Sequence, residues 1–302
     1  TLCCGRSSRH NHFVQVTPSS VRVVDASASR AGVVSSWSPP GSGTIKVASL
    51  DEGCSRVLVS HGGGTVAVLE FGAADGKLPA KPPAAVDVGS EVACVSAGWT
   101  AGGFCAAATW DCRVMVLAMP GLRIVHTEKL EGDAVPRSIA AAELGGGATF
   151  VLCGMGDGHL VGFGLDCRTG ALHDRKERSL GTKPVGLRQV RSHVFAACNR
   201  PTVIYTRGPQ SSSSGGGAAA AAAAQMASQK LMFSNVNLRE VSHVCSFKKP
   251  APEEVMDAEE RTMESLAIGT EGRLGIGTTD ELQKLDSRNR DENEQPWRAE
   301  DH

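Results

Sequence analysis

The fold is decided by residues 57–69, which have the sequence VLVSHGGGTVAVL. Two runs rich in valine flank three consecutive glycines. β-branched residues favour strands, and glycine lets the backbone reverse direction within a few residues. This stretch therefore predicts a β-hairpin with its turn at residues 62–64.

The same arrangement of apolar run, turn and apolar run occurs five more times along the chain. The turns centre near residues 18, 111, 157, 200 and 272, and the paired runs are Val14–Val16 and Val21–Val24, Phe104–Ala108 and Val114–Leu117, Phe150–Cys153 and Leu160–Phe163, Val194–Ala196 and Val203–Tyr205, and Leu266–Gly269 and Leu274–Ile276. Successive turns are 43 to 48 residues apart, except for a last interval of 72. A period of roughly 40–50 residues built from short strands is typical of a β-propeller with one four-stranded blade per period.

Further strands complete the predicted blades. An apolar segment precedes five of the hairpins, and another follows the third; they are Ile45–Ala48, Val92–Val95, Ser138–Ala140, Val185–Leu187, Val241–Val244 and Leu122–Val125. Helix signals are almost absent. The sequence therefore predicts an all-β protein, a WD40-like propeller of about six blades. The Trp-Asp dipeptide occurs once, at Trp110, so this is not an ordinary WD40 array.

The long last interval contains a low-complexity stretch, Gly208 to Gln229, with runs of serine, glycine and alanine. Such a composition cannot bury a core, so we expect this insertion to be disordered and dispensable. The propeller is expected to span residues 1–285. Residues 286–302 form a polar tail without an apolar pattern and are expected to be disordered.

Composition and charge exclude several classes of protein. The 302 residues are 41% hydrophobic with a net charge of −1, which argues against a uniformly basic protein that coats nucleic acid. No apolar run approaches the roughly 18–20 residues that span a bilayer. Residues 1–250 carry a net charge of +8 and residues 251–302 carry −9. Either the surface is simply solvated with an acidic end, or a mildly basic face meets an acidic partner. The chain begins at Thr1, and we expect a cut N-terminus.

The ten cysteines are scattered and include no C-x-x-C pair. Several lie among alanine and valine, where a thiol behaves as a small core residue. A chain of this length needs no disulfide staple. This usage predicts free thiols and a reducing compartment, cytosol or nucleus.

Two glycine-rich motifs resemble parts of enzymes. His61 followed by three glycines resembles the oxyanion loop of lipases, but the G-x-S-x-G elbow that such an enzyme needs is absent. Residues 154–158 resemble a phosphate loop, but they lead into a predicted strand where a nucleotide motif opens a helix. We interpret both as hairpin turns.

The remaining candidates for metal binding or catalysis are weak. Cys3, Cys4, His10 and His12 lack the usual zinc-ligand spacing and are interpreted as a strand and its loop. The polar segment 173–176, His-Asp-Arg-Lys, is interpreted as a solvated turn, because no nucleophile lies at a recognisable spacing. We therefore predict no catalytic, cofactor or metal site, and no enzyme.

The four tryptophans are assigned from their neighbours in the sequence. Trp37, Trp99 and Trp110 lie close to predicted strands and are expected to pack in the blade core. Trp297 lies in the polar tail and is expected to be exposed.

Several motifs, in conserved order along the chain, point to a family: Gly156–Leu165, Thr169–Lys176, Leu180–Val185, Arg200–Tyr205, Leu231–Val241 and Ile276–Leu285. The series resembles the damage-specific DNA-binding protein 1 family from about Thr1 to Leu285. Two paralogous families share the architecture, the third subunit of splicing factor 3b and the large subunit of the cleavage and polyadenylation factor. The segments 200–205 and 234–238 are more similar to the damage-binding family.

The resemblance implies most of the second of three seven-bladed propellers. In that family this propeller docks cullin 4, and the other two propellers clamp substrate receptors. The implied function is a non-enzymatic adaptor of a cullin 4–RING ubiquitin ligase in DNA repair and protein ubiquitination. The implied partners are cullin 4 and substrate receptors, with no cofactor and no membrane, in the nucleus and also the cytoplasm. No short motif marks the residues that contact cullin, so these stay unknown.

Two other functions stay open, a propeller scaffold in splicing or polyadenylation and a propeller hydrolase. Dispersed basic residues predict weak or no DNA binding by the chain alone, so that damaged DNA is met only through a partner subunit. About six blades are counted where the resemblance implies seven. We therefore expect the ring to leave a gap and the isolated chain to be marginally stable.

Overall fold

The computed structural model describes residues 1–7, 12–25, 32–41, 43–51, 53–78, 83–98, 100, 102–144, 147–190, 192–206, 230–236, 238, 240–250, 262–270 and 273–278. In these residues the regular structure is entirely β-strand. The chain divides into two compact units. The first comprises residues 1–142, 149–155 and 161–176, and the second comprises residues 143–148, 156–160 and 177–302.

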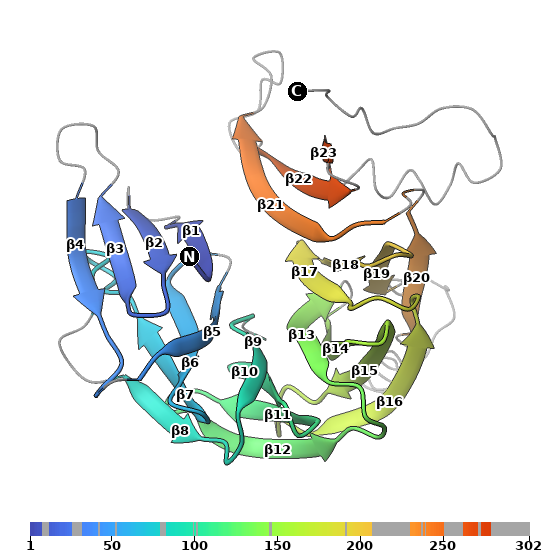
Figure 1. Ribbon diagram of the computed structural model, residues 1–302, viewed down its shortest axis with the longest axis horizontal. Helices are drawn as coiled ribbons and strands as arrows, with labels where there is room; N and C mark the ends of the chain where they lie inside the picture. Colours follow the sequence, from blue (N-terminus) through green and yellow to red (C-terminus); the bar gives the residue numbers. More distant parts are fainter. Residues whose placement is uncertain are drawn as a thin grey trace, which may run out of the picture. The chain divides into compact units, whose positions relative to one another are not determined.

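The first unit contains three complete antiparallel sheets in which strands follow one another in chain order. The first strands of these sheets lie along one side and the last strands along the opposite side (Figure 1). The strands are β1 (Cys3–Arg6), β2 (His12–Val16), β3 (Val21–Asp25) and β4 (Gly32–Trp37); β5 (Ile45–Leu50), β6 (Arg56–His61), β7 (Thr65–Glu70) and β8 (Ala84–Asp87); and β9 (Val92–Ser96), β10 (Phe104–Thr109), β11 (Arg113–Ala118) and β12 (Arg123–Lys129).

The hairpin of β6 and β7 is confirmed where the sequence predicts it. Val57 pairs with Leu69 and His61 with Thr65, so the ladder runs up to the three glycines. Gly62 and Gly63 have φ of 62° and 90°, which glycine adopts without the steric penalty of a Cβ.

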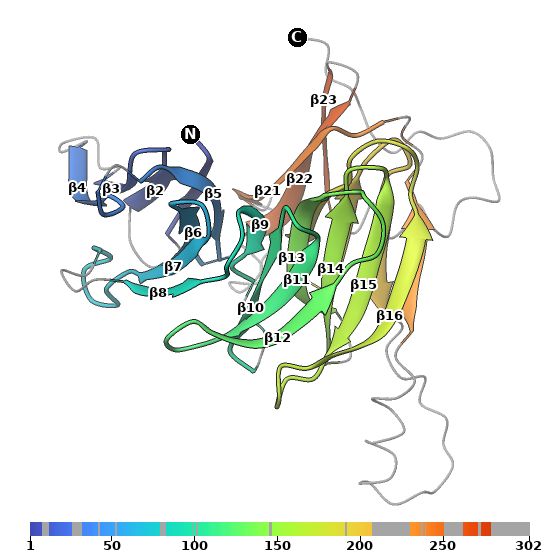
Figure 2. The ribbon, with the colours of Figure 1, turned by 60° about the horizontal axis from the view of Figure 1, so that its bottom comes forward.

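The middle strands of the second sheet, β6 and β7, are buried on both faces because sheets pack on either side of them (Figure 2). Val57 and Val59 join one apolar cluster with Val14 of the first sheet. Leu58, on the opposite face of β6, joins another cluster with Met115 of the third sheet. This arrangement explains the continuous apolar runs, where a half-buried strand would alternate with polar residues. Each fully buried aliphatic side chain contributes about 1.5–3 kcal/mol.

A fourth sheet contributes residues to both units. Its strands are β13 (Pro136–Leu144), β14 (Ala148–Met155), β15 (His159–Leu165) and β16 (Leu172–Ser179), again in chain order. The prediction of a solvated turn at residues 173–176 is wrong, because these residues belong to β16. The strand is charged because it forms an edge of the sheet, where charged side chains discourage pairing with other chains.

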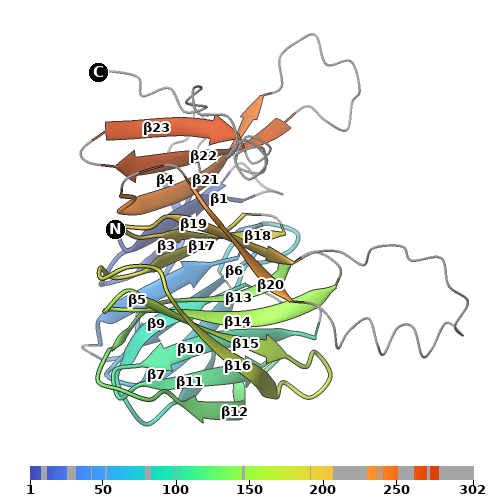
Figure 3. The same ribbon diagram turned by 90° about the vertical axis from the view of Figure 1, so that its right-hand side faces the viewer.

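The second unit contains a four-stranded and a three-stranded antiparallel sheet among the described residues, the latter with its strands side by side (Figure 3). The strands are β17 (Gly186–Val190), β18 (His193–Ala197), β19 (Thr202–Thr206) and β20 (Leu231–Asn235); and β21 (His243–Pro250), β22 (Thr262–Thr270) and β23 (Arg273–Thr278). β21 begins two residues later than predicted, since the Val241 N–H bonds the Cys198 carbonyl, at 3.0 Å, within the connection. The described residues form five four-stranded sheets and one three-stranded sheet, which confirms the predicted all-β propeller of about six blades.

None of the ten cysteines forms a disulfide, and six are buried: Cys54, Cys94, Cys105, Cys112, Cys153 and Cys198. Burial raises the pKa of Cys94 and of Cys105 to about 12 and raises that of Cys153 well above the ordinary value. The expectation that many thiols serve as small core residues is therefore confirmed.

Several sequence expectations fall outside the described residues. These are the insertion at residues 208–229, the tail at 286–302, and the positions of His10, Trp99 and Trp297. In the part of the chain that is described, no helix could span a membrane.

Candidate interaction surface

Trp110 is the most conspicuous side chain on the turn between β10 and β11. Its side chain is 45% exposed, although the residue just before it, Thr109, is completely buried. The prediction that Trp110 packs in the blade core is wrong, because the residue occupies the turn itself. Trp37, by contrast, packs partly buried against an apolar cluster, as predicted.

The turn that carries Trp110 is braced by its own side chains. The Thr109 hydroxyl donates a hydrogen bond of 2.5 Å to one oxygen of Asp111, and Arg113 Nε donates one of 2.7 Å to the other. The Cys112 N–H bonds the Thr109 carbonyl at 3.0 Å. Cys112 has a φ of 61°, the left-handed conformation that closes this tight turn.

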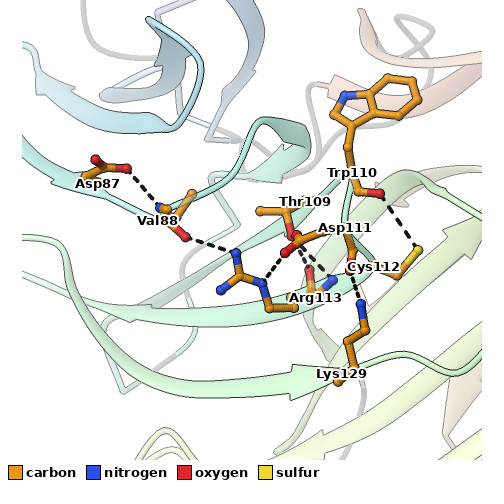
Figure 4. A network of polar contacts seen from close by, with 9 residues as sticks. Asp87, Val88, Thr109, Trp110, Asp111, Cys112, Arg113 and Lys129 are labelled. Atoms are coloured by element: carbon orange, nitrogen blue, oxygen red, sulfur yellow. Dashed lines mark hydrogen bonds and ion pairs between the residues drawn. The ribbon is translucent and has the colours of Figure 1, made fainter.

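The braced turn is also tied to the chain on either side. The Trp110 N–H bonds the Glu91 carbonyl at 2.9 Å, and Arg113 Nη2 reaches the Val88 carbonyl at 3.4 Å. From β12, Lys129 Nζ bonds the carbonyl of Asp111. Figure 4 shows the bonds of Arg113 and Lys129 in this network, with the Trp110 indole directed away from them. The backbone under the indole is therefore fixed while the indole itself stays available.

The charge on Asp111 is favoured by this environment. Burial acts to raise the pKa of its carboxyl, but hydrogen bonds from Thr109, Arg113 and Ser90 outweigh that effect, so the pKa is lowered. Asp111 is thus ionised near neutral pH, and the bond from Arg113 is a charge-assisted one.

The three candidate metal residues that the structure describes, Cys3, Cys4 and His12, are not brought together. Cys3 and Cys4 pair with Val16 and Gln15, whereas His12 lies at the other end of the same hairpin. No group of three His, Cys, Asp or Glu side chains able to hold a metal occurs among the residues that the structure describes.

The two glycine-rich motifs are both turns, as interpreted. His61 ends β6 and is buried, and desolvation lowers the pKa of its imidazole. Gly154 and Met155 end β14 and residues 156–158 join it to β15, so no helix begins there. The pair of His173 Nδ1 and Asp174 Oδ2, 3.0 Å apart, lies exposed on β16.

Sheets of four strands in chain order define a β-propeller, and an exposed tryptophan on a braced turn gives it a surface suited to protein contacts. The model of the RSE1/DDB1/CPSF1 second beta-propeller family matches residues 1–263. The chain therefore belongs to this family of β-propellers.

Individual relatives agree with this membership. The chain is 37% identical to DNA damage-binding protein 1a of Arabidopsis thaliana over 295 residues, which are 94% of the chain and 23% of the relative. It is 36% identical to DNA damage-binding protein 1 of Oryza sativa subsp. japonica, covering 99% of the chain and 25% of the relative. The Drosophila melanogaster protein of the same name is 34% identical over 91% of the chain and 22% of its own length. The chain thus spans about a quarter of the length of these relatives.

One feature of the sequence indicated that Trp110 is exposed, although we interpreted this residue as part of the blade core. Trp110 and Asp111 stand between two apolar runs, at a position where a turn must form. A large aromatic residue in a two- or three-residue turn has no sheet face to cover it. That position, rather than the residue type, indicates exposure.

Proposed function

We propose that this propeller is the cullin 4 docking module of a ubiquitin ligase adaptor. The family membership supports a scaffold role, and the cullin is the partner that the sequence resemblance implies. The adaptor acts without catalysis of its own, in the nucleus and also the cytoplasm. Substrate receptors and damaged DNA are reached through other parts of the assembly.

The observation that carries this proposal is the exposed Trp110 on its braced turn. Tryptophan is enriched among the residues that dominate protein interfaces, because it covers a large area with few rotatable bonds. The Trp110 N–H donates to the Glu91 carbonyl, Arg113 donates to the Asp111 carboxylate, and Lys129 donates to the Asp111 carbonyl. These bonds fix the backbone of the turn before binding, so less entropy is lost on association.

The test is a pull-down of cullin 4 by the purified chain and by Trp110→Ala. We expect the wild-type chain to retain cullin 4 and the variant to bind at least about tenfold more weakly. Val33→Ala is the matched control, because Val33 is a large apolar residue that is 57% exposed on a different sheet. Equal retention by Trp110→Ala, or capture of splicing factor 3b subunits in place of cullin 4, would contradict the proposal.

A further inference from the structure

We draw no further inference here: the strongest candidate, the apolar row of Phe13, Val24 and Val33 across strands β2, β3 and β4 of the first sheet, carries nothing because no contact among the described residues shows what covers it.

Discussion

Two turns of this propeller share a pair of side chains, an aspartate and a basic residue two positions later, and differ in the residue before the aspartate. In the turn between β10 and β11, Asp111 accepts a hydrogen bond from Arg113 two residues later, at 2.7 Å. In the turn between β14 and β15, Asp157 pairs with His159 two residues later, at 2.9 Å. The repeated aspartate and basic residue brace the hairpin, so this pair is structural.

The differences between these turns lie around the aspartate. Trp110 precedes one aspartate and Gly156 precedes the other. The residue after the aspartate has positive φ in both turns, Cys112 at 61° and Gly158 at 92°. A Cβ on Gly158 would collide with the carbonyl oxygen of Gly181, so this position excludes a side chain. The comparison shows that the pair of aspartate and basic residue recurs in both turns, while the residue before the aspartate differs and is an exposed tryptophan in only one of the two.

The largest expected effect is that of Gly158→Ala. The new methyl group must move the Gly181 backbone and also adopt positive φ, so we expect a loss of about 3 kcal/mol in the free energy of unfolding. Gly63→Ala is the control, since Gly63 has φ of 90° but open space around its Cβ position. It should lose about 1 kcal/mol. Urea denaturation measures both, and equal losses would show that contact with Gly181 is unimportant.

The next largest effect is the difference in stability between removing Asp111 and removing Asp157. Asp111→Ala removes the acceptor for both Thr109 and Arg113, and we expect a loss of about 1–2 kcal/mol. Asp157→Ala removes a pair between more exposed groups, and we expect about 0.5 kcal/mol. The same denaturation assay compares them. An equal loss from both would mean that the buried Thr109 adds nothing to the brace.

Acid should weaken the interactions of Asp111 and Asp157 in both turns. Burial acts to raise the pKa of Asp157, but hydrogen bonds from His159 and its charge outweigh it, and the pKa of Asp111 is lowered as well. A lowered folded-state pKa stabilises the fold above the unfolded value of about 3.9, and this stabilisation is lost as pH falls through the folded-state pKa. Unfolding free energy followed by urea titration should therefore fall below about pH 4. The difference between wild type and Asp111→Asn should shrink over the same range; a constant difference would contradict this.

The smallest effect is expected from His159→Arg, which gives the second turn the pair found in the first. The side chains are exposed, so the gain should not exceed about 0.5 kcal/mol at neutral pH. Thermal unfolding in low and high salt measures it. A gain that persists in high salt would indicate packing rather than charge.

The sequence predicted the hairpins because their signals are local. Val57 to Leu69 holds the apolar runs and the glycines of one turn within a few residues, and the structure has that hairpin. The charged strand β16 was missed, since an edge strand needs no apolar pattern of its own. The exposure of Trp110 was missed as well, because we judged the residue by its type and not by its place in the turn, where no sheet face covers it.

The burial of the cysteines has a practical consequence for following this molecule in solution. Cys4 and Cys245 are exposed, whereas Cys94, Cys105 and Cys153 lie in the interior with raised pKa. An alkylating reagent needs the thiolate and physical access. It will therefore modify the surface pair in the native molecule and the interior thiols only when a molecule opens. The number of labels per chain, counted by mass spectrometry, therefore reports how often the interior of the fold opens.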